Sequence, residues 1–295
     1  METSLEQIWK IETELLTHLL DVCQQHGLRC FMSGGSLLGV VRHKGFIPWD
    51  DDIDLWMPRP DYDRLLQVGP KEFQEPHFFQ SAYTDTDYFH PHVQIRHSQT
   101  TAIRPSDVYQ PFNQGIFIDV FPIDGVPDSD ADLQKLLHYT RRGFRFLKAK
   151  NTHILMSGRL GLVVRKWQAR RAVKKQWWTT LYKDTEDLFR QYPYETSQRV
   201  GTLASDGGRL LFTRDLFGMA YGEFQGMQVP IPSGWHDILS RQYGPNYMTP
   251  VRSASTHGEI LFDVSRPYTE VLPEAQKQYR RSALQRLWRK IVRKI

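Results

Sequence analysis

Apolar residues near the N-terminus recur with the period of an α-helix. This face consists of Leu5, Ile8, Trp9, Leu15, Leu16, Leu19, Leu20 and Cys23. Glu12 is the one polar residue on the same face, and Gly27 follows as a helix-stopping residue. The pattern therefore predicts a helix over Leu5–His26.

Short apolar runs and helical patterns alternate after this helix. The predicted strands are 28–32, 53–57, 77–83, 92–97 and 116–121, and Asp124, just past the last strand, is interpreted as a turn residue. The predicted helices are 37–41, 62–68, a group within 133–183, and 235–243, which ends at Gly244-Pro245. Such alternation is typical of an α/β fold.

A glycine turn followed by a run of acids is the most informative stretch for chemistry. Gly34, Gly35 and Ser36 follow a short apolar run and precede a predicted helix. Glycines at such a turn let backbone N–H groups approach a phosphate at a helix N-terminus. Asp52 and Asp54 lie two residues apart in a predicted strand, so both carboxylates are expected to face one site.

Two carboxylates this close do not both stay ionised without a cation. Mg²⁺ or Mn²⁺ suits them, because these ions bind one or two carboxylates together with substrate phosphates. The turn and the acids together favour metal-assisted phosphoryl transfer. An acidic surface turn is the alternative, but the apolar flanks Phe46-Ile47 and Leu55-Trp56-Met57 indicate partial burial.

Asp119 is the one acid inside the apolar run 116–121, which predicts a buried central strand. A lone acid in such a strand is expected to be paired or bound to a metal. A buried Asp that caps a loop is the alternative.

The glycine turn Gly-Gly-Ser-Leu-Leu-Gly and the later Arg-His-Lys-Gly-Phe-Ile-Pro-Trp-Asp-Asp-Asp-Ile-Asp closely resemble the LicD family. That family contains phosphocholine transferases and the fukutin-type ribitol-phosphate transferases. The likeness resumes near Gly201 and includes 221–224, 229–232 and 235–244. It implies an α/β fold of the nucleotidyltransferase type, with a small mixed sheet, flanking helices and a basic helical insertion.

The resemblance also implies roles for individual residues. Asp52, Asp54 and Asp119 would be the catalytic residues and the ligands of one or two Mg²⁺ (or Mn²⁺) ions. The turn 34–36 would position the donor diphosphate, and Asp119 could assist deprotonation of the acceptor.

Three further positions match the family pattern less specifically. Arg96 lies in a segment that resembles one near the donor phosphate, with a surface residue on an edge strand as the alternative. His257 matches a histidine after the last helix, where a phosphate contact and a structural role are both open. Glu223 is a candidate additional ligand.

Composition and charge narrow the class of protein. The 295 residues contain no apolar run of transmembrane length, and the N-terminus lacks the basic start and apolar core of a signal peptide. The two cysteines, Cys23 and Cys30, cannot build a disulfide framework or a zinc site on their own. A cytoplasmic location is therefore the expectation.

The net charge of +5 is unevenly distributed. Every charged residue in 133–183 and in 275–295 is Lys or Arg, so the remaining chain is acidic. Basic segments with interleaved aromatic residues suggest an anionic surface, either lipid or nucleic acid. In the last segment the basic residues lie opposite an apolar stripe that contains Trp288, which favours a membrane surface. No nucleic-acid partner is expected.

These features suggest a division of the chain into four parts. They are a catalytic core at 1–132, a basic helical insertion at 133–200, the C-terminal part of the catalytic domain at 201–274, and a basic amphipathic helix at 275–295.

The resemblance to the LicD family implies transfer of a phospho-alcohol group from a CDP-linked donor to a sugar hydroxyl. The acceptor would be a lipid-linked precursor of a cell-surface glycan, such as teichoic acid or lipopolysaccharide, at the inner face of the cell membrane. The resemblance favours CDP-choline over a CDP-polyol, because phosphocholine is the commonest group that bacterial LicD-like enzymes transfer. A quaternary ammonium needs aromatic faces or a carboxylate, and Trp49 and Trp56 flank the acids, with Trp49 the better candidate. Both tryptophans packing in the core is the alternative.

Two other classes of protein remain open. A nucleotidyltransferase that adds a nucleoside monophosphate to a sugar or a phosphate would use the same acids but release pyrophosphate in place of CMP. A non-catalytic protein that binds a membrane surface or nucleic acid would use the basic segments alone and would gain nothing from clustered carboxylates.

Overall fold

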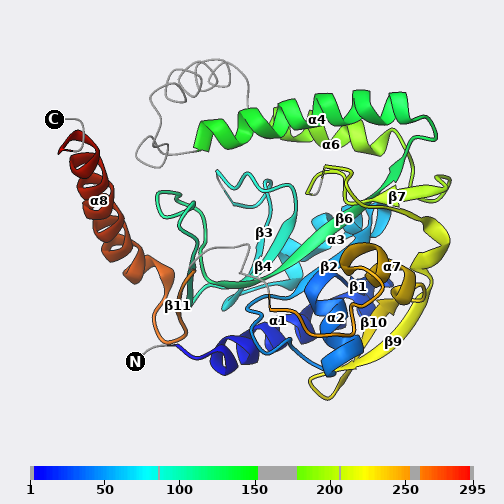
Figure 1. Cartoon of the computed structure of the whole chain (residues 1–295), viewed down its shortest axis with the longest axis horizontal. Coiled ribbons are helices and arrows are strands. Elements are labelled where there is room, and N and C mark those ends of the chain that lie inside the picture. The colour runs from blue at the N-terminus through cyan, green and yellow to red at the C-terminus, as the bar shows by residue number, and fades with distance from the viewer. Residues whose placement is uncertain (1–2, 86, 152–177, 206, 253–259, 293–295) are drawn as a thin grey trace.

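The computed structural model describes residues 3–85, 87–151, 178–205, 207–252 and 260–292 (Figure 1). Their elements form a mixed sheet with helices against it, which confirms the predicted α/β fold.

The central sheet has the strand order β1-β2-β6-β4-β3. In that order the strands are Phe31–Met32, Asp54–Pro58, Ile116–Val126, Val93–His97 and His77–Gln80. The β2–β6 pair is parallel, whereas the β1–β2, β4–β6 and β3–β4 pairs are antiparallel. The sheet is therefore mixed, as predicted.

The strand β6 organises the sheet from its centre. Its first half pairs with β2 and β4, and its last residues pair with β7 (Arg199–Gly201), which in turn pairs with β8 (Leu211–Thr213). Asp119 lies in the buried first half and is 3% exposed. The chain beyond residue 198 thus returns to the sheet that carries the acids.

Helix α1 (Leu5–His26) has the predicted bounds and covers the sheet with its apolar face (Figure 1). Ser4 and Gln7 form a capping box at its start, and Gly27 ends it with a left-handed φ of 64°. Local signals of this kind fix helix ends without help from tertiary contacts, which explains why the prediction was accurate.

Other predicted elements differ in length. The strand expected over 28–32 is reduced to β1, and the strand expected over 77–83 ends at Gln80, because the Ser81 N–H and hydroxyl bond Thr84 in a turn. Helix α2 (Gly34–His43) starts at the glycines themselves, and α3 (Arg59–Glu72) takes Pro60 into its first turn.

Two long helices lie side by side along one flank of the molecule (Figure 1). They are α4 (Asp130–Asn151) and α6 (Trp178–Arg190). The predicted helix near 160–167 lies outside the described residues.

A separate hairpin packs near the glycine turn. Its strands are β9 (Met219–Phe224) and β10 (Met227–Pro232), reached through the short helix η2 (Arg214–Phe217). Helix α7 (Trp235–Tyr243) follows with the predicted bounds, and α2 contacts both α7 and β9.

The last described segment returns to the middle of the chain. Strand β11 (Leu261–Asp263) pairs with β5 (Thr101–Ile103), and α8 (Tyr268–Val292) follows. Val271 and Ala275 are buried against Ile103. The C-terminal helix therefore begins at Tyr268, before the predicted start at 275. Among the described residues, no helix is long and apolar enough to cross a membrane.

Candidate active site

Three consecutive acids form a carboxylate cluster in the turn before β2. One oxygen from each of Asp50, Asp51 and Asp52 lies within 4.8 Å of the corresponding oxygens of the other two. Trp9 of α1 holds the turn in place, because its indole N–H donates to the Asp50 carbonyl at 2.9 Å. We refer to these three residues as the acid cluster. Carboxylates this close repel one another, and a hard divalent cation is the partner that suits them.

Asp54 begins β2 next to this cluster. Its backbone N–H donates to the Ser36 hydroxyl at 2.9 Å, and its carbonyl accepts from the Ser33 N–H at 3.0 Å. Burial raises the pKa of Asp54 well above its ordinary value, and the charges of Asp52 and Asp119 raise it further. A bound cation would stabilise the ionised form of the Asp54 carboxylate.

The structure brings Asp52 and Asp54 to one site, but not by strand alternation. Asp52 precedes β2 and lies in an irregular turn, so the expected two-residue repeat does not position it. Its closeness to Asp54 comes from the turn that Trp9 anchors.

The two glycines let the acids approach the start of α2. A Cβ at Gly35 would lie 2.6 Å from an Asp50 carboxylate oxygen, and one at Gly34 would lie 3.6 Å from an Asp54 oxygen. Gly34 also has a left-handed φ of 51°. The acids lie against Gly34 and Gly35, at the positive end of the α2 dipole. Ser33 makes no side-chain cap at this end of the helix. Ser36, in contrast, uses its hydroxyl to hold β2.

Asp119 lies beside Asp54 in the β2–β6 ladder but has protein partners of its own. Its oxygens lie 3.1 Å from His92 Nε2 and 3.4 Å from Arg104 Nη2, and the Gln94 amide donates to it at 2.5 Å. Burial would raise the pKa of Asp119, but His92, Arg104 and Gln94 outweigh it and hold the pKa below its ordinary value. The carboxylate is thus kept ionised, which makes it a weak base. That Asp119 binds a metal stays a prediction.

Arg96 is buried at 2% exposure and bonds groups of its own chain. Its guanidinium donates to the Gly115 carbonyl at 2.6 Å and to the Gln80 and Gln94 side-chain oxygens. Burial lowers its pKa to about 10. Through Gln94, Arg96 helps to orient Asp119. Contact between Arg96 and a donor phosphate stays a prediction.

Two residues near the acids were not predicted as site residues. Glu12 on α1 is 1% exposed, and no hydrogen-bond partner of its Oε2 lies among the described residues. Burial raises its pKa, and Asp52 and Asp51 raise it further. Tyr243 ends α7, and its hydroxyl would lie 3.9 Å from a Cβ at Gly34. The signal for Glu12 was present in the sequence, as the single acid on the apolar face of its helix.

The remaining candidates have different surroundings. His257 lies outside the described residues. Glu223 is half-exposed and pairs with Lys44 at 3.1 Å on the surface. Trp56 is 6% exposed and packs against Phe212 in the core. Trp49 precedes the acid cluster in the chain and is partly buried against the core.

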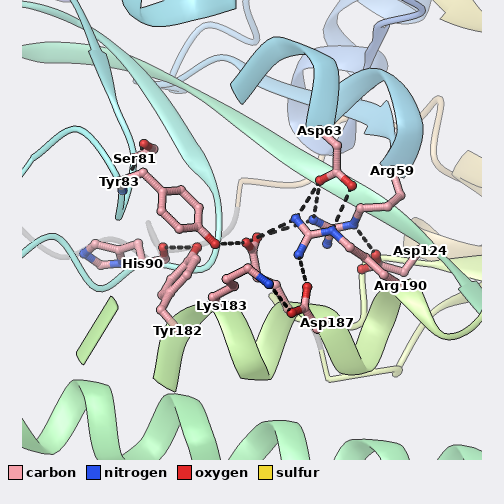
Figure 2. Close-up of polar contacts among 11 residues, drawn as sticks. Arg59, Asp63, Ser81, Tyr83, His90, Asp124, Tyr182, Lys183, Asp187 and Arg190 are labelled. Atoms are coloured by element: carbon pink, nitrogen blue, oxygen red, sulfur yellow. Dashed lines mark hydrogen bonds and ion pairs between the residues drawn. The ribbon is translucent and has the colours of Figure 1, made fainter. Parts of the chain in front are cut away.

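A buried ionic network supports the far end of β6 (Figure 2). Arg59 of α3 donates to Asp124 at 2.6 Å and lies 3.4 Å from Glu186 of α6. Arg190 of α6 bonds Asp63 of α3 through two contacts of 2.8 Å. Asp124 was interpreted as a turn residue, but it lies within β6 at 0% exposure. The network ties α3, β6 and α6 together.

The comparisons with known proteins point to the same residues. Positions 27–126 match the LicD/FKTN/FKRP nucleotidyltransferase domain, and this stretch carries the glycine turn, the acid cluster and Asp119.

Two relatives extend the likeness. The chain is 28% identical over 247 residues to the lipopolysaccharide cholinephosphotransferase LicD of Haemophilus influenzae. The match covers 79% of this chain and 87% of that protein. The chain is also 30% identical over 91 residues to the human ribitol 5-phosphate transferase FKRP, a match that covers 26% of this chain and 18% of that protein.

Proposed function

Since the chain is a LicD-family phosphotransferase, we propose that it transfers a phospho-alcohol group from a CDP-linked donor to a hydroxyl of a glycan acceptor. The observation that carries this proposal is the close approach of the glycine turn to the acids. A Cβ at Gly35 would lie 2.6 Å from an Asp50 carboxylate oxygen, so the start of α2 and the acid cluster lie against each other. A donor diphosphate needs both parts, namely N–H groups for its oxygens and carboxylates for its counter-ion.

The residues of the site fit a divalent cation. Asp50, Asp51 and Asp52 lie close enough to share one, and Asp54 lies beside them. Glu12 adds a buried carboxyl group whose Oε2 has no hydrogen-bond partner among the described residues. These acids would hold Mg²⁺ or Mn²⁺, which when bound would neutralise the diphosphate and lower the pKa of the acceptor hydroxyl.

The remaining groups of the site would bind the donor or hold the acids in place. The first N–H groups of α2 would bind donor phosphate oxygens, because Gly34 and Gly35 allow close approach. Ser36 fixes the start of β2 through its bond to the Asp54 N–H. His92 and Arg104 hold the Asp119 carboxylate in place, so that its charge faces Asp54 across the ladder.

Phosphocholine is the favoured group. The Haemophilus influenzae relative, which is matched over most of its length, is a cholinephosphotransferase by name. Trp49 could supply an aromatic face for a quaternary ammonium beside the acids, whereas Trp56 is committed to the core. The acceptor would be a lipid-linked glycan, and the enzyme would work at the inner face of the cell membrane.

The released nucleotide tests the reaction and the donor together. The purified chain is incubated with Mg²⁺, an acceptor extract, and CDP-choline, CDP-ribitol or CDP-glycerol in turn. We expect CMP from CDP-choline. CMP from a CDP-polyol but not from CDP-choline would contradict the choice of donor. A parallel incubation replaces the CDP-alcohol with CTP. Pyrophosphate from CTP, together with no CMP from any CDP-alcohol, would contradict the reaction class and favour a nucleotidyltransferase.

A further inference from the structure

A second group of metal-binding side chains lies away from the acid cluster, at the edge of the sheet. One ligand atom from each of Glu14, His77 and His97 lies within 4.8 Å of the other two. The proposed phosphotransfer uses none of these residues. We propose that they bind one Zn²⁺ ion.

The three ligands come from three elements that the fold holds in place. His77 on β3 and His97 on β4 are direct partners in the antiparallel ladder, so their side chains project from neighbouring positions on one face. Glu14 reaches them from α1, which contacts β4. Because the ligands sit on a helix and two strands, their spacing is set by the fold and not by a loop.

A fourth residue, His18, orients one of the ligands. Its Nδ1 lies 2.7 Å from His77 Nδ1, and the opposite nitrogen of His77, Nε2, lies 2.8 Å from Glu14 Oε1. Histidines that bind metals commonly donate their second ring N–H to a neighbour, which fixes the ring and its tautomer. His77 has such a neighbour on one side and the shared ligand position on the other.

His97 has a nitrogen that lacks a partner. Its Nδ1 is buried, and the residues that the structure describes offer it no hydrogen bond. A buried polar atom without a partner is costly, and it commonly marks a group that binds an ion or a water molecule.

The donor set selects the metal. Two imidazoles and one carboxylate suit Zn²⁺, whereas Mg²⁺ prefers oxygen ligands alone. Three protein ligands leave a fourth tetrahedral position for water. Cys23 and Cys30 are both buried in the main core and are not part of this group. The ion would join α1 to the edge strand of the sheet.

Calorimetric titration with ZnSO₄ tests the proposal. The full chain is prepared without a histidine tag and stripped of metal with a chelator. ZnSO₄ is then added in the presence of excess MgCl₂, which occupies the acid cluster. We expect one equivalent of Zn²⁺ to bind. His77→Ala and His97→Ala should each lower the affinity at least about tenfold, and His18→Phe should lower it about tenfold to a hundredfold.

A matched control comes from the same helix. His26 ends α1 and pairs with Glu72 at 2.8 Å, outside the group, so His26→Ala should bind Zn²⁺ as the wild type does. Thermal unfolding with and without Zn²⁺ provides a second readout. The midpoint should rise with Zn²⁺ in the wild type and in His26→Ala, but not in His77→Ala.

The ligands can also be identified without substitutions, in case a histidine variant fails to fold. Co²⁺ bound to the wild-type chain should show the weak visible bands of nitrogen and oxygen ligands. An intense near-ultraviolet band from thiolate ligands would overturn the assignment. So would a wild-type chain that binds no Zn²⁺ in excess Mg²⁺, or one whose affinity is unchanged by His77→Ala and His97→Ala together. In those cases Glu14, His77 and His18 form a hydrogen-bonded chain only.

Discussion

Asp54 and Asp119 are neighbours in one ladder, yet their surroundings differ in charge. Asp54 lies among other acids, and Asp119 lies between His92 and Arg104. The same substitution should therefore affect the two positions differently.

Asp54→Asn should remove most activity without loss of stability. The change removes one negative charge from a crowded group, so the free energy of unfolding should stay equal or rise. Turnover should fall by a factor of about 10²–10³, the range found when one charge-stabilising group is removed from an active site. CMP release tests the predicted loss of activity, and urea unfolding of the same protein tests the predicted stability. Near wild-type turnover would remove Asp54 from the site.

Asp119→Asn should lower both activity and stability. Arg104 is largely buried, and the loss of the Asp119 charge removes the strongest of the attractions that offset its burial, with Asp107 as the next. Removing one member of a buried ion pair typically costs about 3–5 kcal/mol. Urea unfolding should show this loss, and Asp54→Asn is the matched control. A variant as stable as the wild type would mean that His92 and Arg104 do not depend on the Asp119 charge.

The glycine turn and the acids after it could be predicted because they are close in the sequence. Gly34, Gly35, Asp52 and Asp54 fall within a short stretch whose residue types alone suggest phosphate and metal chemistry. The partners of Asp119 could not be predicted, because strand pairing and loop placement bring them together, and neither leaves a periodic signal.

At the scale of the elements, the buried ionic network joins α3, β6 and α6. We expect it to contribute more to stability than the other polar contacts in Figure 2. Arg59, Asp124 and Glu186 are each at most 5% exposed. Arg59→Met would leave Asp124 buried without its cation and Glu186 with Arg190 alone, at 3.3 Å. The expected cost is about 3–5 kcal/mol in the free energy of unfolding.

A control for Arg59→Met lies on the exposed side of α6. Lys183 and Asp187 of α6 pair at 2.6 Å but are 63% and 43% exposed. Lys183→Met should change the free energy of unfolding by less than about 1 kcal/mol. Urea unfolding of both variants checks the contrast. Equal small effects would mean that α6 is not held to the sheet by this network.

Element bounds were predicted best where the local sequence sets them. Helix α1 has a capping box and a terminal glycine, and α7 ends before Gly244-Pro245. Strands β5 and β11 were missed, because three residues are too few to show a period. The helix predicted over 62–68 is longer in the structure, because α3 begins at Arg59 and takes Pro60 into its first turn.

For the molecule as a whole, the basic C-terminal segment is expected to bind anionic membranes. Residues 281–295 contain six Lys or Arg and no acid. Each contributes on the order of 1 kcal/mol near an anionic leaflet. Removing 281–295 should weaken binding to anionic liposomes but spare turnover of a soluble acceptor. Vesicle co-sedimentation at low and high salt checks this, because the binding should be salt-sensitive.

The position of the cut matters for that experiment. Ala275 is buried, and Gln276 donates to the Val108 carbonyl at 3.0 Å, so a cut before 275 would also remove packing. A full-length variant with the six basic residues changed to Gln is the control. Unchanged liposome binding with a lower melting temperature would mean that the helix packs on the protein itself.

The pairing of β6 with β7 has a consequence for isolated fragments. The stretch that matches the family domain, 27–126, ends in a strand whose last three residues bond β7. It also lacks α1, which covers the sheet, and α6, which supplies Glu186 to Arg59. Expressed by itself, this fragment would expose an apolar sheet face, so it should aggregate. A soluble catalytic fragment would have to run at least from α1 to β11, which is nearly the whole described chain.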